Sequence, residues 1–581
     1  MDIFTLSNID VAVMAIYAVL IIGYGLYSAK ASSSEDYFLA GRNMTWPIVG
    51  ISLFAANISS STLVGLAGDA YKTDVHVFNY EWLASVVLVF FAIFFLPFYL
   101  RSKVYTMPEF LERRYDARSR YYFSFITIVG NVLIDTAAGL YVGTVVMKLI
   151  FPDLSTFTIV TVLAIAAAAY TIPGGLNSVI QTEVIQAILL IIGSILITYY
   201  AFAEVGGWSG FIAGLDRMGA AGELPHVGDG YHPTDAEGVL SLIRPVGDGI
   251  GNFLLGTGGD ELMPWTGLLL GAPILGFYFW ANNQFMVQRV LGAKDLDHGR
   301  WGAIFAGFLK LPVLFIMVIP GAVAILLFQD LDMSTVNYLK ADGTVCQDLA
   351  DCPNATYPLL LFNLLPTGVL GLVLAGLLAA MMSSASATFN SASTLITMDF
   401  VAKLRPDLSS KQLVRVGQIS TLVLVVLASA WAPMIESFPS LFQYLQIVLS
   451  FIAPPVAAAF IVGMFWKRAN GNGGFWSLIF GFAYAGLYLV LSVFMGVENW
   501  FTEMHFLHRT FYLFLLCILV NVVVSLQSAP PAPEKLDGYT WKQEFLAAET
   551  KELEGVVWYK NYRIQAIVLL VVTAILVAFF W

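Results

Sequence analysis

The chain has 581 residues, of which 58% are hydrophobic and 12% are charged. Together with a mean hydropathy of +0.77, this composition excludes a soluble globular protein of this length and indicates a polytopic membrane protein. The formal net charge of −11 excludes little, because in a membrane protein the placement of charge says more than its sum.

The first apolar run covers about residues 9–28 and could be taken for a signal peptide, because it ends near a small-residue sequence, Ala29-Lys30-Ala31. Signal peptides begin with a basic region. Here Asp2 and Asp10 lie before or in the run and no Lys or Arg precedes it. We therefore predict a retained first span with its N-terminus outside the cell.

Apolar runs of roughly 18 residues or more are long enough to cross a bilayer as helices. The chain contains fourteen such runs, some of them long enough to be tilted or to hold more than one helix: 9–28, 46–69, 80–100, 120–150, 155–172, 178–203, 262–288, 301–328, 357–402, 411–433, 438–466, 474–495, 508–527 and 562–581. The polar stretches between them are too short for an enzymatic domain. The sequence therefore predicts an all-α membrane protein that is not an enzyme.

Basic residues indicate the orientation. With the N-terminus outside, the cytoplasmic loops hold 22 of the 29 Lys and Arg residues, Arg289 among them, as the positive-inside rule requires. An even number of spans then places the C-terminus outside as well, in the cell membrane. Cys346 and Cys352 share one polar loop and could form a local disulfide if that loop faces an oxidising compartment.

Four ionisable residues in predicted spans are singled out: Glu81, Asp135, Glu183 and Lys310. Each costs roughly 2.5–3.5 kcal/mol to insert, so each is a candidate functional residue. The alternative is that they pair with one another only to hold helices together. That alternative explains all four together less well, because helix packing in membranes usually relies on small residues and hydroxyls.

The stretch "FAANISSSTLVG", residues 54–65, places Asn57 and four hydroxyl residues in the middle of a span. Such side chains compete for backbone hydrogen bonds and favour a break in the helix. The alternative is a continuous helix whose hydroxyls bond back to the preceding turn. A break would expose backbone carbonyls, which are oxygen ligands suited to a small cation.

A second polar stretch, "LLAAMMSSASATFNSAST", places Ala380, Ser383 and Ser384 on one helical face, with Ser386 nearby. Two hydroxyls and three carbonyls would form a site of five oxygens with no formal charge. Such a site suits Na⁺ better than a divalent ion.

Six segments together resemble the solute–sodium symporter family, in particular its sodium/glucose cotransporter branch, in order from about residue 34 to 470. They are "SEDYFLAGRNMTWPIVGISLFAANISSSTLVGLAG", "YTMPEFLERRY", "YTIPGGLNSVIQTEVIQ", "QFMVQRVLGAKD", "MSSASATFNSASTLITMDF" and "APPVAAAFIVGMFWKRAN". The resemblance implies fourteen transmembrane helices with a LeuT-like core of two inverted five-helix repeats. In this fold the first helix of each repeat is broken.

The resemblance also implies a division of the chain into five parts. They are an N-terminal span and cytoplasmic loop (1–45), a first repeat (46–203), an extracellular region (204–261), a second repeat with an extracellular loop at 329–356 (262–466), and three C-terminal spans with a cytoplasmic linker at 528–561 (467–581).

By resemblance, sodium is held by the carbonyls of Ala55, Ile58 and Ala380 and the hydroxyls of Ser383 and Ser384. Some relatives bind a second sodium through an acid on the fifth core helix. Here that acid is Glu183 in place of the usual Asp, Ser386 is present, and Ala387 lacks a hydroxyl. We expect a weakly bound second sodium at Glu183 and Ser386, although Glu183 could also carry a proton or pair with a neighbouring helix.

The sugar site implied by the resemblance has seven members: Asn57, Thr62, Glu81, Phe279, Trp280, Lys310 and Gln446. Their charged and amide groups can replace the hydration shell of a polyol. Five positions depart from the family pattern. Four of them are Phe279 where Tyr is frequent, Ala84 for a hydroxyl, Gly276 for a hydrogen-bonding side chain, and Asp135 where a neutral or basic residue is common. Thr62 also replaces a larger polar residue.

We therefore predict a sodium-coupled symporter that takes up a sugar or related polyol by alternating access, with Na⁺, the solute and the lipid bilayer as partners and no nucleic acid. Myo-inositol, sialic acid or another organic solute is the alternative substrate. A proton-coupled transporter, or a sensor or channel that does not transport, is the alternative class.

Overall fold

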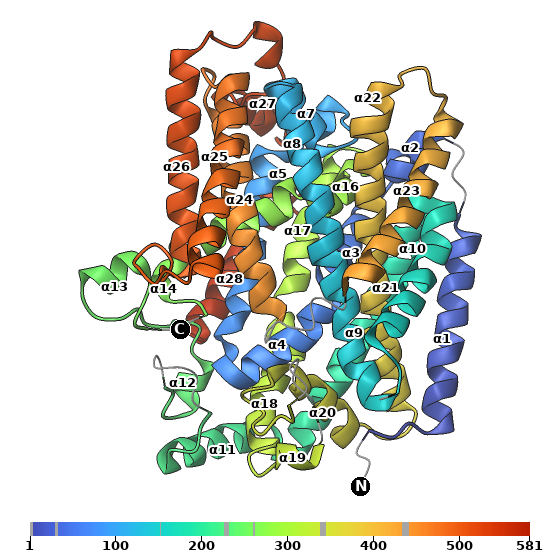
Figure 1. Ribbon diagram of the computed structural model, residues 1–581, viewed down its shortest axis with the longest axis vertical. Coiled ribbons are helices and arrows are strands. Elements are labelled where there is room, and N and C mark those ends of the chain that lie inside the picture. Colours follow the sequence, from blue (N-terminus) through green and yellow to red (C-terminus); the bar gives the residue numbers. More distant parts are fainter. Residues whose placement is uncertain are drawn as a thin grey trace.

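The computed structural model describes residues 4–29, 33–151, 153–225, 232–259, 262–336, 338, 344–432 and 441–581. Within these residues every helix or strand element is a helix, and an isolated β-bridge joins Met44 to Ala293. The helices run mostly along the long axis of the molecule (Figure 1). The predicted fold class, an all-α membrane protein, is confirmed at this level.

Seven helices of the described chain are single elements of 16 to 25 residues: α1 (Asn8–Tyr27), α5 (Asn79–Phe94), α23 (Ser410–Trp431), α24 (Leu441–Phe465), α25 (Gly471–Leu489), α26 (Phe506–Gln527) and α28 (Tyr562–Phe579). Most of α1 is exposed, as expected for a peripheral helix that faces lipid. By contrast, α21 (Val369–Leu395) is almost entirely buried and lies at the centre of the bundle.

Several spans are interrupted. Two pairs are bent at a short break: α3 (Trp46–Asn57) with α4 (Ser60–Thr73) by 60°, and α17 (Leu296–Lys310) with the segment that continues through Leu314–Val318 into α18 (Ile319–Leu327) by 40°. A third stretch is divided into α14 (Trp265–Leu270), α15 (Ala272–Phe277), a π-helical turn (Tyr278–Asn282) and α16 (Gln284–Leu291). Its chain is extended at Asn283. A π-helical segment (Gly130–Thr136) also joins α8 (Ala117–Val129) to α9 (Ala137–Ile150).

The longest helix, α10 (Thr156–Val205), contains a kink and unites two predicted runs, 155–172 and 178–203. Pro173 removes a helical amide, and Gly175 has a φ of +56°, which strains any residue with a Cβ. A Cβ at Gly175 would also lie 2.3 Å from the carbonyl oxygen of Tyr37. The kink therefore requires glycine at this position.

Ten helices among the described residues are long and apolar enough to cross a membrane, or up to twelve if each bent pair counts as one span. The sequence predicts fourteen. The difference has a physical origin: α10 counts once although it holds two predicted runs, and the run at 262–288 is divided into helices that are individually too short.

The short helices gather at the two ends of the molecule (Figure 1). One end holds α11 (Gly207–Ala221), α12 (Ala236–Leu240) and α19 (Met333–Val336); the other holds α2 (Ser34–Leu39), α7 (Met107–Arg114), α22 (Ala402–Leu404) and α27 (Gln543–Glu552). The remaining short helices are α6 (Leu96–Ser102), α13 (Ile250–Leu255) and α20 (Thr356–Leu364). The segments predicted to be extracellular and those predicted to be cytoplasmic therefore lie at opposite ends.

The linker between α26 and α28 is tied to the bundle through Glu549 of α27. Its carboxylate forms an ion pair with Arg300 of α17, accepts a hydrogen bond from Tyr562, and lies 2.8 Å from Arg563. Burial alone would raise the pKa of Glu549, but the hydrogen bonds and charges of these partners outweigh it and lower the pKa. The linker is therefore a folded part of this end of the molecule.

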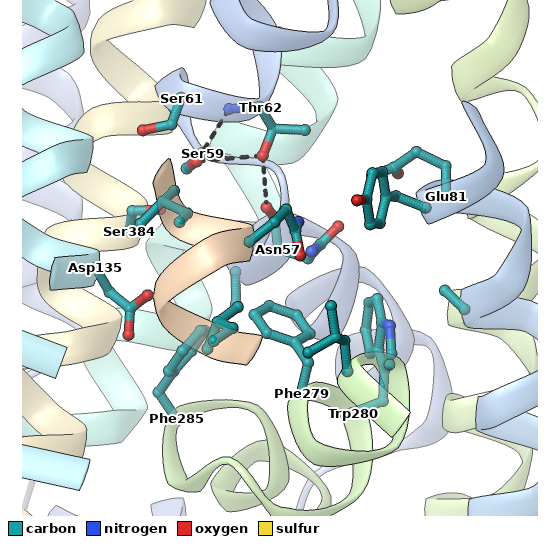
Figure 2. A pocket seen from close by; sticks show the side chains of 18 of the residues that line it. Asn57, Ser59, Ser61, Thr62, Glu81, Asp135, Phe279, Trp280, Phe285 and Ser384 are labelled. Carbon is teal, nitrogen blue, oxygen red and sulfur yellow. Dashed lines mark hydrogen bonds between the residues drawn. The ribbon is translucent and has the colours of Figure 1, made fainter. Parts of the chain in front are cut away.

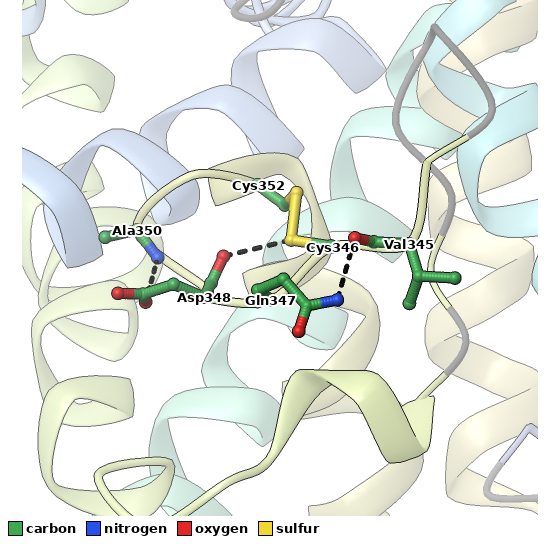
Figure 3. The surroundings of a disulfide bond; sticks show 6 residues. All are labelled: Val345, Cys346, Gln347, Asp348, Ala350 and Cys352. Atoms are coloured by element: carbon green, nitrogen blue, oxygen red, sulfur yellow. Dashed lines mark hydrogen bonds between the residues drawn. A yellow bond between two sulfur atoms is a disulfide. The ribbon is translucent and has the colours of Figure 1, made fainter.

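At the opposite end, Cys346 and Cys352 form a disulfide (Figure 3), so the local pairing that the sequence allowed is present. In the same loop the Asp348 carboxylate accepts a hydrogen bond from the Ala350 amide at 2.9 Å. The following turn packs closely on α4, because a Cβ at Gly68 would lie 2.4 Å from the Pro353 carbonyl oxygen. The loop therefore packs against α4, the second half of the broken helix.

Candidate functional site

The break between α3 and α4 falls at Ile58 and Ser59, which confirms the interruption predicted for this stretch. Ile58 has a φ of −79° and a ψ of 85°, and Ser59 is extended. The Ser59 hydroxyl caps α4 by accepting a hydrogen bond from the Thr62 amide at 3.2 Å. The Thr62 hydroxyl donates to the Asn57 carbonyl at 3.1 Å. Serine and threonine therefore satisfy the backbone on both sides of the break.

Two backbone carbonyls at the break, those of Ala55 and Ile58, accept no backbone hydrogen bond from the described residues. The Ile58 amide donates to Phe54, and the Ser59 amide donates to Asn57. In the described part of the chain, no amide beyond the end of α3 donates a hydrogen bond to the Ala55 or Ile58 carbonyl. These are two of the three carbonyls expected to bind sodium, and each keeps its lone pairs for another partner.

Across from the break, α21 packs against both α3 and α4. The Ser383 hydroxyl is buried and has no hydrogen-bond partner in the described residues, whereas Ser384 lines an internal cavity. Ala380 lies on the same face, one turn earlier. A buried hydroxyl without a hydrogen-bond partner destabilises the fold. The Ser383 and Ser384 hydroxyls and the free backbone carbonyls are oxygen ligands, so this group of residues fits a bound cation. Among the described residues, no group of three His, Cys, Asp or Glu side chains could hold a metal ion.

The internal cavity has a volume of about 120 Å³ and lies beside the break (Figure 2). Six of the seven residues predicted for the sugar site line it: Asn57, Thr62, Glu81, Phe279, Trp280 and Gln446. Sequence reasoning did not single out other residues of the wall, among them Tyr80, Phe285 and Thr388. Of these, Thr388 could most easily have been predicted from the sequence, because it lies one helical turn after Ser384.

Lys310 is the seventh predicted residue, and it lies behind the cavity wall. Its ammonium group donates hydrogen bonds to Glu81 Oε2 and Asn57 Oδ1 and lies 5.6 Å from the centre of the Trp280 ring. Lys310 is 1% exposed and Glu81 is 4% exposed. Lys310 therefore neutralises Glu81 and orients two polar groups of the wall, while Glu81 and Asn57 face the cavity.

Glu183 lies outside this cavity wall and is fully buried. Arg289 of α16 forms an ion pair with it and binds both carboxylate oxygens, and the Ser52 hydroxyl donates to Oε2 at 2.5 Å. The Ser386 hydroxyl donates to the Ser383 carbonyl at 2.9 Å. Both groups expected at a second sodium site thus have protein partners here. Sequence reasoning placed Arg289 in a cytoplasmic loop and missed its role as the partner of Glu183.

Asp135 is the fourth predicted intramembrane ionisable residue, and it also lines the cavity. It belongs to the π-helical segment Gly130–Thr136. The structure therefore brings two of the four ionisable residues to the cavity wall, places Lys310 directly behind it, and separates Glu183 from it.

An interrupted helix beside a cavity lined by both polar and aromatic side chains, inside a bundle of membrane-spanning helices, is typical of the class of secondary active transporters. The model of the sodium:solute symporter family matches residues 37–481, and the chain belongs to this family. It is accordingly a sodium-coupled solute symporter and not an enzyme, with Na⁺ as its coupling ion and a multi-pass arrangement in the membrane.

Individual relatives agree. The chain is 34% identical over 561 residues to a sodium/glucose cotransporter 1 of Ovis aries, covering 94% of this chain and 82% of that one. It is 35% identical over 559 residues to a sodium/myo-inositol cotransporter 2 of Homo sapiens, covering 92% and 78%. Among solved structures, a Na⁺-coupled sialic acid symporter matches with a TM-score of 0.69 at 20% identity, covering 90% of this chain and 99% of that one. This last similarity establishes the shared fold.

Proposed function

We propose that the chain couples inward movement of Na⁺ to uptake of a sugar or related polyol by alternating access in the cell membrane. The observation that carries this proposal is the cavity wall, where the Glu81 carboxylate and the Asn57 amide, both held by Lys310, lie in the same cavity as the Trp280 ring. Polar groups with fixed orientation beside an aromatic face suit a hydroxylated ring. Relatives named for glucose and myo-inositol transport support the same class.

Each wall residue would have a distinct role. Glu81 and Gln446 would bind solute hydroxyls, Asn57 and Thr62 would add polar contacts beside the break, and Phe279 and Trp280 would pack against the ring face of the solute. Lys310 would act as a positioning residue, because its ammonium group is already engaged by Glu81 and Asn57.

For the ion, we propose one sodium bound by the carbonyls of Ala55, Ile58 and Ala380 and the hydroxyls of Ser383 and Ser384. The free carbonyls at the break and the unpartnered Ser383 hydroxyl support this assignment. We assign no ion to Glu183 and Ser386, since a second sodium there would have to displace Arg289 and Ser52 from the Glu183 carboxylate.

For the topology, we propose fourteen spans with the core arranged as two inverted repeats, 46–203 and 262–466. Dividing α10 at Gly175 and counting 262–288 as one interrupted span raises the twelve candidates to fourteen. The parts 1–45, 204–261 and 467–581, with the loop 329–356 and the linker 528–561, would complete the chain. Both termini would lie outside, on the side of the Cys346–Cys352 disulfide, which an oxidising compartment favours.

One sodium ion provides enough energy for accumulation. Its movement through about 100 mV supplies roughly 2.3 kcal/mol, and a tenfold concentration ratio adds about 1.4 kcal/mol. The sum supports an accumulation of several hundredfold.

The test is uptake of labelled hexoses, inositols and sialic acid into proteoliposomes, with an inward gradient of Na⁺, of protons, or of neither. We expect uptake of a sugar or polyol that requires Na⁺. Uptake driven by protons alone, or Na⁺-dependent uptake restricted to solutes without several hydroxyls, would contradict the proposal.

A further inference from the structure

The two acidic residues of the cavity wall, Glu81 and Asp135, differ in whether a positively charged side chain neutralises them. Glu81 has a dedicated counter-charge in Lys310. Asp135 is half-buried and lines the same cavity, and the described residues provide it with no hydrogen bond and no ion pair. Figure 2 shows the two carboxylates on opposite sides of the cavity. The described wall contains no Lys, Arg or His that could neutralise Asp135.

The cavity wall with its Lys310 neighbour therefore carries one uncompensated negative charge. A neutral solute that filled the cavity would displace water from that carboxylate without supplying a counter-charge, and a buried unpaired charge is strongly unfavourable. A solute with a cationic group would neutralise it through a charge-assisted hydrogen bond, which is stronger than one between neutral groups.

The remainder of the wall also suits an organic cation. Four aromatic side chains line the cavity: Tyr80, Phe279, Trp280 and Phe285. Aromatic ring faces attract ammonium groups through their quadrupoles. Phe285 and Asp135 lie on the same side of the cavity in Figure 2, so a carboxylate and a ring face are available together on that side.

We propose that Asp135 selects a solute that carries a protonated amine, so that the preferred substrate is an amino sugar or an aminated polyol. This inference rests on the proposed sugar and polyol function and narrows its substrate class. Glu81, Asn57 and Gln446 bind the hydroxyls, and Asp135 binds the ammonium group on the opposite side. The same charge excludes solutes that carry a carboxylate.

A rival explanation is that the coupling sodium neutralises Asp135, because Ser384 also lines this cavity. The two explanations differ in what Asp135→Asn changes. A substrate role changes the preference among solutes at constant Na⁺ affinity, whereas an ion role changes the Na⁺ affinity and the charge carried per solute for every solute.

The experiment uses the full chain in proteoliposomes with an inward Na⁺ gradient, at a pH where amines are protonated. The probes are hexoses and myo-inositol in which one hydroxyl at a time is replaced by an amine, together with the neutral parents and the N-acetylated forms. We expect at least one amine to be taken up with a half-saturation concentration tenfold or more below that of its parent and its N-acetylated form.

The preference should disappear in Asp135→Asn and persist in Asp135→Glu, which keeps the charge. Thr388→Val is the matched control: it removes a polar group from the same cavity wall without removing charge, and the ratio of amine to parent should persist. The comparison within the native protein requires no variant to fold.

Native Na⁺-dependent uptake of neutral parents with no preference for any amine would overturn this inference and leave the proposed function intact. A fall in Na⁺ affinity and in charge per solute for all solutes in Asp135→Asn would overturn it in favour of the ion role. Absence of Na⁺-dependent uptake for every sugar and polyol, aminated or neutral, would overturn the proposed function and this inference together.

Discussion

Two of the buried ion pairs are Lys310–Glu81, between α17 and α5, and Arg289–Glu183, between α16 and α10. Each is also hydrogen-bonded to α3, but the two differ in what their carboxylates face. Arg289 engages both oxygens of Glu183, and Ser52 of α3 donates a further hydrogen bond. Lys310 engages only Oε2 of Glu81 and shares its charge with Asn57 at the end of α3. The Glu81 side chain lines the cavity, whereas Glu183 does not.

The difference shows that burial and charge alone do not identify a binding residue. Glu183 is the more completely buried acid, with a side chain that is 0% exposed, yet its hydrogen-bonding capacity is used within the protein. Glu81 keeps one oxygen, Oε1, without a described partner. A carboxylate whose second oxygen stays free and faces a cavity can bind a solute, while a carboxylate held on both oxygens ties helices together.

The largest effect, a loss of stability, should follow from breaking the Arg289–Glu183 ion pair. Either Glu183→Gln or Arg289→Met leaves one partner without its counter-charge in a fully buried position, which costs about 3–5 kcal/mol. We expect the double variant Glu183→Gln/Arg289→Met to recover a large part of this loss, because it removes both charges. The free energy of unfolding in detergent, measured for the three variants, tests the prediction.

Ser52→Ala is a milder variant of the same site, and it removes one hydrogen bond while leaving the ion pair intact. We expect it to fold and to keep one charge per solute in proteoliposomes when the solute is a neutral sugar or polyol. A native ratio of two charges per neutral solute that falls to one in Ser52→Ala or Glu183→Gln would restore Glu183 as a ligand of a second sodium.

Breaking the Lys310–Glu81 ion pair at the cavity should weaken solute binding. Lys310→Ala leaves Glu81 without a counter-charge, and Glu81→Ala removes a ligand of the solute, so each should weaken solute binding by roughly thirtyfold, about 2 kcal/mol. Neither change should abolish the thermal stabilisation that Na⁺ confers. Calorimetric titration with the solute and melting curves with and without Na⁺ separate the two readouts. Loss of the Na⁺ response with normal solute binding would refute this assignment.

Sequence reasoning could identify the charged residues but not their partners. Because charge is expensive in a bilayer, the sequence alone singles out Glu81, Asp135, Glu183 and Lys310. Pairing depends on how helices far apart in the chain pack together: Lys310 and Glu81 are separated by 229 positions. Arg289 escaped notice because it lies just beyond an apolar run and was counted with the loops.

The break in the first core helix could be predicted, because Asn57 and the hydroxyl residues after it favour local hydrogen bonds over a continuous helix. The π-helical segments could not. One of these segments contains Asp135 and another contains Trp280. A π-helical turn adds a residue to the helix and rotates the residues beyond it. Apolar periodicity does not reveal such a rotation, so the set of side chains that line the cavity could not be derived from it.

Neither ion pair contributes a ligand to the proposed sodium site. Substitutions of serines in α21 test that site by itself. Ser384→Ala removes one of two hydroxyl ligands from a site without a carboxylate to compensate. We expect the apparent Na⁺ affinity to fall by at least tenfold, about 1.4 kcal/mol, while the protein still folds. Ser393→Ala is the matched control, because the Ser393 hydroxyl bonds only within α21, to the Asn390 carbonyl at 3.0 Å. Unchanged Na⁺ dependence in Ser384→Ala would place the ion elsewhere.

The smallest effect should come from the cap at the break itself. Ser59 caps α4 and Ser155 caps α10 in the same way, accepting amide hydrogen bonds at 3.2 Å and 3.1 Å, but only Ser59 adjoins the carbonyls proposed to bind sodium. Loss of a serine cap costs about 1 kcal/mol, so Ser59→Ala and Ser155→Ala should lower the free energy of unfolding by similar amounts. Only Ser59→Ala should also lower the Na⁺ affinity, and by less than Ser384→Ala, because the cap holds the geometry of the break without contacting the ion. Na⁺ titrations of both variants, followed by thermal stability, provide the comparison. An equal loss of Na⁺ affinity in Ser59→Ala and Ser155→Ala would mean that the loss reflects general destabilisation of the protein. The Ser59 cap would then have no specific role in Na⁺ binding.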